Sequence, residues 1–171
     1  VYDLYDKVDV CCIGGLKGIP GISHISLIRS IKREIKSRNT DIAISFIADT
    51  FFYTAMALMG TNIPLLYSER GDPSKRMHKK EMKLYHKVIE KFSKGVVFQI
   101  EGAKRFFGKR VRENSVVILN PFNTEKLPDY DFENRKKEIV TMGRICSQKN
   151  HSLLIDAFAL IADEFEDYTL K

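Results

Sequence analysis

Short apolar runs rich in β-branched residues alternate along this chain with longer stretches in which apolar positions recur every three or four residues. The runs predict buried strands at residues 8–13, 42–47, 63–68, 96–100, 116–119 and 139–142. Alternation of strands and helices is typical of a parallel sheet with crossover helices, and continuously apolar strands are typical of burial on both faces. The pattern therefore predicts an α/β fold.

Helical periodicity is clear in the stretches between these runs. The predicted helices cover residues 25–39, 50–59, 82–92 and 154–165. Residues 168–171 have the pattern of a strand that is only beginning, and the chain starts without a methionine or a signal-like sequence. We therefore expect a chain that is truncated at both ends.

A change of pattern at residues 120–137 predicts a domain boundary. This stretch has no periodicity, several charges and two prolines, Pro121 and Pro128. We expect an N-terminal Rossmann-like domain at residues 1–122, a linker at 123–137 and the first strand–helix unit of a second domain at 138–171. Such a unit cannot bury its own apolar face without further chain.

Composition, charge and cysteines limit the classes of protein. A hydrophobic content of 44% favours a packed core over disorder, yet no apolar run is long enough to cross a bilayer. Cys11, Cys12 and Cys146 give neither a disulfide framework nor a Cys-x-x-Cys pair, which favours a reducing cytoplasm. The net charge of +6 suits an anionic partner, whether membrane surface, nucleic acid or phosphorylated ligand.

The stretch from residue 139 to residue 151 carries the most chemistry, because a strand there feeds a short loop that opens a helix. Gly143 would let the backbone approach a ligand, and Arg144 can form bidentate hydrogen bonds with phosphate oxygens. Lys149 adds a positive charge beside the free amide groups at the start of the helix. His151 is a further candidate contact, with capping of the helix as its alternative. These residues predict a diphosphate site, although spacing alone also permits an ordinary turn with surface charges.

The pattern Gly-Arg-x-x-x-x-Lys-Asn-His, followed by Leu-Leu-Ile-Asp-Ala-Phe, resembles the donor-site motif that opens the C-terminal domain of family 4 (group 1) glycosyltransferases. The resemblance implies the GT-B architecture, in which two Rossmann-like domains each have a doubly wound parallel sheet. It also implies that Arg144 and Lys149 bind the diphosphate of a sugar nucleotide. Because these cations and the helix amides would stabilise the leaving diphosphate, we expect no metal and no cofactor.

A second segment, residues 63–73, is similar to the strand and loop of the same family that face the cleft between the two domains. It places Ser68, Glu69 and Arg70 just past the carboxyl end of a strand, where open α/β sheets bind ligands. Asn120 stands in another segment that resembles the family in the right order. These residues are candidate cleft contacts, with a helix-capping turn and an Arg–Glu pair as the alternative for the first three.

The resemblance implies a retaining hexosyltransferase that moves a sugar from a nucleoside-diphosphate sugar to a glycan or lipid-linked acceptor in cell-surface polysaccharide synthesis. No catalytic residue is identified within the segment, and the family's pair of donor-binding glutamates is expected downstream of residue 171. The segment alone is therefore expected to be inactive. We expect a cytoplasmic protein. A basic run at residues 75–112 suits either a solvated face or peripheral contact with the inner face of the membrane, and both interpretations remain open.

Two other functions remain open at this point. A sugar-nucleotide epimerase would share the fold but should show catalytic carboxylates and histidines, which we do not identify. A basic nucleic-acid-binding module would suit the charge, but the aromatic residues fall mostly at core positions and no recognition motif is present, so we expect no nucleic-acid partner. The Asp-x-Asp triplet at residues 129–131 is interpreted as part of the linker, and the glycines at 14–21 as a connector.

Overall fold

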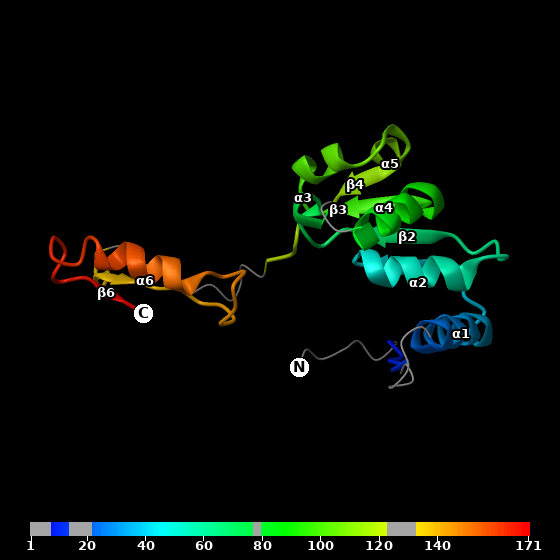
Figure 1. The fold of residues 1–171 in the computed structure, drawn as a ribbon, viewed down its shortest axis with the longest axis horizontal. Coiled ribbons are helices and arrows are strands. Elements are labelled where there is room, and N and C mark those ends of the chain that lie inside the picture. Colours follow the sequence, from blue (N-terminus) through cyan, green and yellow to red (C-terminus); the bar gives the residue numbers. More distant parts are fainter. Residues whose placement is uncertain (1–7, 14–21, 77–79, 123–132) are drawn as a thin grey trace. The chain divides into compact units, whose positions relative to one another are not determined.

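A computed structural model of the chain describes residues 8–13, 22–76, 80–122 and 133–171 (Figure 1). The chain divides into two compact units, residues 1–121 and residues 122–171. The glycine-containing connector at 14–21, the Asp-x-Asp triplet at 129–131 and most of the predicted linker lie outside the described residues. The assignment of an acceptor-side and a donor-side domain remains a prediction.

The first unit contains a parallel sheet with the strand order β1-β2-β3-β4. These strands are β1 Ala43–Phe46, β2 Leu65–Ser68, β3 Gly95–Phe98 and β4 Ser115–Val117. Each strand pairs with the next one along the chain, and the register places Ser45 opposite Tyr67 and Phe46 opposite Ser68. Parallel neighbours need a crossover between them, and helices supply it here. The carboxyl ends of all four strands therefore meet at one edge of the sheet.

The helices of the first unit are α1 Ile22–Ser37, α2 Ala48–Leu58, α3 Pro73–Arg76, α4 Lys80–Phe92, the 3₁₀-helix η1 Glu101–Phe106 and α5 Lys109–Glu113. Helix α2 packs against both α1 and α4 and also contacts β1 and β2 (Figure 1). The sequence of α2 is mostly apolar. The chain turns away from the helix at Gly60, whose φ of +80° suits a residue without a side chain. Hydrophobic burial of α2 therefore ties the helical layer to the sheet.

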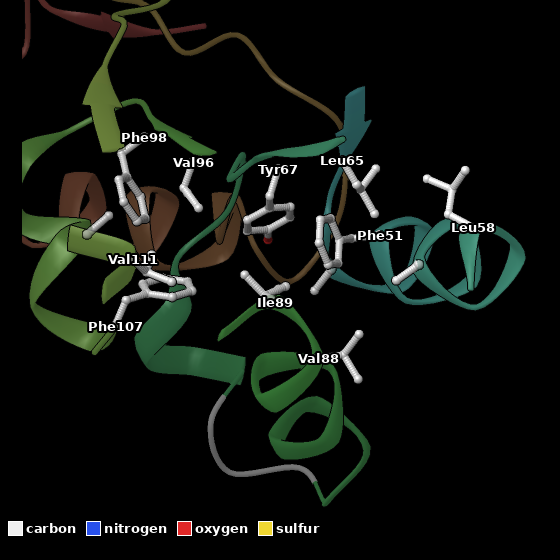
Figure 2. Close-up of a cluster of buried hydrophobic side chains, with 13 residues drawn as sticks. Phe51, Leu58, Leu65, Tyr67, Val88, Ile89, Val96, Phe98, Phe107 and Val111 are labelled. Atoms are coloured by element: carbon white, nitrogen blue, oxygen red, sulfur yellow. The ribbon is translucent and has the colours of Figure 1, made fainter. Parts of the chain in front are cut away.

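The hydrophobic core lies between this helical layer and one face of the sheet (Figure 2). The Phe51 ring meets the Tyr67 ring edge to face, with centroids 5.2 Å apart, and the Phe98 ring lies 5.1 Å from that of Phe107. Tyr67, Phe51, Phe98, Ile89 and Val111 are the largest fully buried side chains among the described residues. Aromatic packing of this kind holds β2 and β3 against the helical layer.

The opposite face of the sheet is more open than the sequence predicts. Ile44, Phe46 and Val116 are 57%, 51% and 50% exposed, although continuous apolar strands predict burial on both faces. The register places Phe46, Ser68, Val97 and Val116 in one row across this face. The expectation of burial on both faces is therefore wrong at Ile44, Phe46 and Val116, although Ser68 in the same row is buried.

The second unit is a small strand–helix–strand arrangement. Strands β5 Glu138–Ile139 and β6 Thr169–Leu170 pair in parallel, and helix α6 His151–Ala159 lies between them in sequence. Ion pairs join Lys137 to Asp167 and Lys171 to Glu138 at the two ends of the pairing. No residue of α6 is buried, as expected for a strand–helix unit with little else to pack against.

Several predicted elements differ from those in the structure. Residues 8–13 form an exposed irregular segment, so the strand predicted there is wrong: an apolar run becomes a strand only where a neighbour accepts its hydrogen bonds. Strand β5 pairs over Glu138–Ile139 alone, whereas residues 139–142 were predicted. Helix α6 ends at Ala159, and residues 160–164 continue as turns rather than as the predicted helix.

Among the described residues, none of the helices combines the length and the apolar character that a bilayer crossing requires.

Candidate functional site

The loop between β5 and α6 turns sharply just before the helix begins. The backbone N–H groups of Lys149 and Asn150 both donate to the carbonyl oxygen of Cys146, at 3.0 and 3.3 Å. Asn150 then adopts a left-handed conformation, with φ of 48°, which this residue type tolerates better than most. This turn returns the chain so that residues at both ends of the loop come close together.

Gly143 and Lys149 are two of the residues that the turn brings together. A Cβ atom built at Gly143 would lie 3.4 Å from Cγ and 3.4 Å from Cδ of Lys149. The aliphatic part of the Lys149 side chain therefore packs against Gly143 at the position where another residue would carry its Cβ atom. Both residues are exposed, and the Lys149 ammonium group forms no ion pair within the described residues.

The His151 side chain contacts the backbone of Arg144. The His151 Nε2 atom lies 3.2 Å from the carbonyl oxygen of Arg144, a contact in which the imidazole can only be the donor. His151 thereby holds the first residues of the loop against the start of α6, which is a positioning role. The Arg144 side chain is exposed, and no carboxylate pairs with it in the described part of the chain.

The start of α6 has no side-chain cap among the described residues. Asn150 occupies the N-cap position, but its side chain makes no capping hydrogen bond and instead accepts one from Ser152 Oγ at 3.2 Å. The first amide N–H groups of a helix need an acceptor, and the helix dipole favours a negative one. The uncapped helix start and the two cations therefore favour an anion at this loop.

The acidic groups beside β5 are already paired with lysines. A hydrogen bond from Lys171 holds the pKa of Glu138 below its ordinary value, and a hydrogen bond to Asp167 raises the pKa of Lys137. Because these carboxylates have their own cationic partners, they do not neutralise Arg144 or Lys149.

A second group of candidate residues stands at the carboxyl edge of the sheet in the first unit. Glu69 follows β2 and is only 2% exposed. Its Oε2 atom accepts a hydrogen bond from the Tyr67 hydroxyl at 2.8 Å, and its Oε1 atom accepts one from the Gly71 backbone N–H at 2.8 Å. Glu69 is therefore a buried residue that shapes the loop, and its role as a cleft contact remains a prediction.

Arg70 projects from that loop onto the ends of the neighbouring strands. Its Nη1 atom donates to Asn120 Oδ1 at 2.9 Å, and its Cζ atom lies 5.2 Å from the centroid of the Phe46 ring. The Gln99 side-chain amide donates to the same Asn120 oxygen. We call these four residues, Phe46, Arg70, Gln99 and Asn120, the carboxyl-edge cluster. Arg70 has no carboxylate partner in the structure as described, so the alternative of an Arg–Glu pair is wrong.

Ser68 does not belong to this cluster, although the sequence places it beside Arg70. Its side chain is 2% exposed, and its Oγ atom has no hydrogen-bond partner among the described residues. Phe46 and Gln99 belong to the cluster but were not selected as site residues from the sequence. Each stands one residue before the end of a predicted strand, so a search of both sides of the strand ends could have found them as well.

The basic run seen in the sequence forms an exposed surface on α4, η1 and α5. Apart from Arg110, its described members with exposed side chains are Lys80, Lys83, Lys87, Lys91, Lys94, Arg105, Lys109 and Arg112. Arg110 belongs to the same run but serves another purpose, since its guanidinium donates to the carbonyl oxygens of Glu90 and Ser93 near the end of α4. We call the eight exposed residues the basic surface.

Acidic, histidine and cysteine side chains do not gather into any group of three that could hold a metal ion within the described residues. The expectation that no metal or cofactor is needed remains a prediction.

No protein-family model and no curated protein matches this sequence. Among solved structures, the chain is similar to the crystal structure of Anabaena Alr3699/HepE in complex with UDP-glucose, with a TM-score of 0.68 and 17% sequence identity. The chain has a Rossmann-like α/β fold of the GT-B type. This confirms the fold class predicted from the sequence. The similarity covers 85% of this chain and 42% of the other, so the chain spans less than half of that protein's length.

Proposed function

We propose that this chain is part of a retaining glycosyltransferase of family 4 (group 1) that uses a nucleoside-diphosphate sugar as its donor. The observation that carries the proposal is the loop before α6, where Gly143 packs on Lys149 and Arg144 stands beside an uncapped helix start. The GT-B-type fold supports it, and UDP-glucose in the similar crystal structure is a ligand of the proposed class.

The loop would act on the leaving group of the reaction. Cleavage of the bond between sugar and diphosphate leaves negative charge on the diphosphate oxygens. Arg144 would contact these oxygens through its planar N–H groups, Lys149 would add a point charge, and the first amides of α6 would donate further hydrogen bonds. Charge stabilisation of this kind acts most strongly as the bond breaks, which lowers the barrier to transfer.

The proposal also covers the acceptor and the transferred sugar. The first unit would bind a glycan or lipid-linked acceptor at the carboxyl edge of its sheet, and the transferred group would be a hexose used in cell-surface polysaccharide synthesis. Because the resemblance assigns further donor contacts to residues beyond this chain, the chain alone would bind the donor weakly and would not turn it over.

Contact with an anionic membrane surface is part of the proposal as well. Leu84, an apolar side chain that is 51% exposed, stands on α4 next to or one helical turn from Lys80, Lys83 and Lys87 of the basic surface. Lysines around an exposed apolar residue are suited to anionic headgroups, each contributing roughly 1 kcal/mol of attraction. Flotation with phosphatidylglycerol vesicles tests this: the chain should float with them, and a variant with Lys83, Lys87 and Lys91 changed to Gln should float less. Equal flotation of both proteins contradicts membrane contact.

Nuclear magnetic resonance on the ¹⁵N-labelled chain tests the donor site. UDP-glucose should shift the amide signals of residues 143–151, and UDP should shift the same signals because it retains the diphosphate. Glucose should leave them unchanged. A short oligonucleotide at equal phosphate concentration distinguishes the rival function, because a nucleic-acid module would respond to it over the basic surface. Shifts confined to the basic surface with every phosphate ligand would contradict the donor site.

A further inference from the structure

The loop after β2 holds the backbone on both sides of Arg70. The Glu69 N–H donates to the carbonyl oxygen of Val97 at 2.9 Å, and the buried Glu69 carboxylate accepts the Gly71 N–H at 2.8 Å. Because Glu69 and Gly71 are both fixed to neighbouring backbone or to a buried side chain, Arg70 leaves the sheet in a defined direction. Glu69 is thus a positioning residue for Arg70.

The side chain of Arg70 is also held in place. Asn120 Oδ1 accepts a hydrogen bond from the Arg70 guanidinium, and the Phe46 ring lies against the same guanidinium. Holding a long side chain in one orientation costs conformational entropy, and here that cost is met before any ligand arrives. The cation is therefore pre-organised.

Some hydrogen-bond donors of this cluster have no partner among the described residues. A guanidinium can only donate, so the atom of Asn120 that faces Arg70 must be its oxygen, and the Asn120 amide nitrogen is left to donate elsewhere. Arg70 uses one nitrogen for Asn120, and no carboxylate pairs with it among the described residues. The cluster thus offers a positive charge and N–H donors from two side chains at one edge of the sheet.

We propose that the carboxyl-edge cluster is a phosphate-binding site and that its ligand is a phosphate group of the acceptor. Donors from a guanidinium and from a separate amide suit the several oxygens of a phosphate better than a flat carboxylate, which one guanidinium satisfies alone. The assignment to the acceptor rests on the proposed function, because the donor diphosphate is assigned there to the loop before α6.

Side-chain resonances of arginine in the full 171-residue chain test the proposal. Inorganic phosphate and glucose 1-phosphate are titrated separately at constant ionic strength, with acetate as the carboxylate control. The Nε–Hε signal of Arg70, assigned by its loss in Arg70→Lys, should shift with both phosphates and shift little with acetate. Arg70→Gln should weaken phosphate binding, read from backbone amides around Asn120, by about tenfold or more.

Matched variants separate this site from general attraction to a basic protein. Arg112→Gln removes one exposed cation from α5 and should leave phosphate affinity at the cluster within about twofold. Asn120→Ala removes the anchor of Arg70 and should weaken binding several-fold while the charge is unchanged. Equal weakening by Arg70→Gln and Arg112→Gln would overturn the site.

The two phosphates distinguish the source of the ligand. A site for an acceptor must accept an esterified phosphate, so glucose 1-phosphate should bind at least as tightly as inorganic phosphate. Exclusion of the ester would overturn the assignment to an acceptor. The outcome is independent of the donor site, because UDP-glucose is read at residues 143–151 in the other unit. Loss of one response with retention of the other identifies which proposal has failed.

Discussion

At the residue scale, the side chains of the two candidate sites differ in burial: Arg144 and Lys149 are exposed, whereas Glu69 is 2% exposed. Arg144 and Lys149 were selected as a pair, and the structure places them in one exposed loop. Glu69 was selected as a cleft contact, yet it is buried and hydrogen-bonded to Tyr67 and Gly71. Burial depends on packing by residues distant in sequence, so a motif alone could not reveal this difference.

Ile47 carries the clearest backbone strain among the described residues. Its φ of 62° and ψ of 156° lie in a region that glycine occupies almost alone, and it joins β1 to α2 directly after Phe46. Such strain costs of order 1–3 kcal/mol, while a flexible glycine costs about 0.5–1 kcal/mol. Ile47→Gly should therefore raise the free energy of unfolding by about 1 kcal/mol, measured by urea denaturation followed by circular dichroism.

The control for Ile47 is Ile44, a similarly exposed isoleucine with ordinary strand geometry in β1. Ile44→Gly should lower the free energy of unfolding, because this substitution relieves no strain. It only adds the larger conformational entropy that glycine loses on folding and removes a residue with high β-propensity. A destabilisation of equal size in both variants would show that Ile47 is not strained.

At the scale of elements, the long periodic segments were predictable and the short ones were not. Strands β1 to β4 and helices α1, α2 and α4 all fall within or close to the predicted stretches. The short η1 and α5 were missed because their six and five residues contain at most two helical turns, too few for a period to show. Strand β5 is shorter than its apolar run because β6 offers it a partner over Glu138–Ile139 only.

Gly60 tests the C-terminal end of α2. Its φ is +80°, and a Cβ atom at this position would meet nothing within 4 Å, so any penalty is conformational rather than steric crowding. Gly60→Ala should lower the free energy of unfolding by about 1 kcal/mol. Gly102 in η1 is equally open but has no positive φ, and Gly102→Ala should be neutral or slightly stabilising in the same urea denaturation. Equal effects would contradict this account of the end of α2.

The pairing of β5 with β6 should depend on pH through Glu138. Its carboxylate accepts a hydrogen bond from Lys171 at 2.7 Å, which lowers its pKa. Because the pKa of Glu138 is lower in the folded than in the unfolded state, its ion pair stabilises the folded state at pH values above the unfolded-state pKa. This stabilisation is lost as the pH falls through the folded-state pKa. The ¹³C signal of the Glu138 carboxyl should titrate below the ordinary range for glutamate, and Lys171→Gln should return it toward that range. An unchanged midpoint would contradict the pairing.

At the scale of the whole molecule, the exposed face of the first sheet should govern self-association. Ile44 and Val116 are about half exposed on this face, and contiguous apolar surface favours association in water. The Ile44→Lys, Val116→Lys variant should show a lower weight-average mass by sedimentation at high protein concentration. Leu84→Lys replaces an equally exposed residue on α4 and should change it less. Equal effects would mean that this face is not the main site of association.

The anion site before α6 carries the proposed donor binding, and the affinity of the chain for UDP-glucose tests it directly. Titration calorimetry would compare the unaltered chain with Arg144→Gln, Lys149→Gln and with a control, Lys109→Gln, Arg112→Gln, that removes the same charge from α5. We predict that the first double variant loses about a hundredfold in affinity, roughly one factor of ten for each charge-assisted contact, while the control stays within about threefold. Equal affinity for UDP-glucose in all three proteins would contradict the proposed donor site.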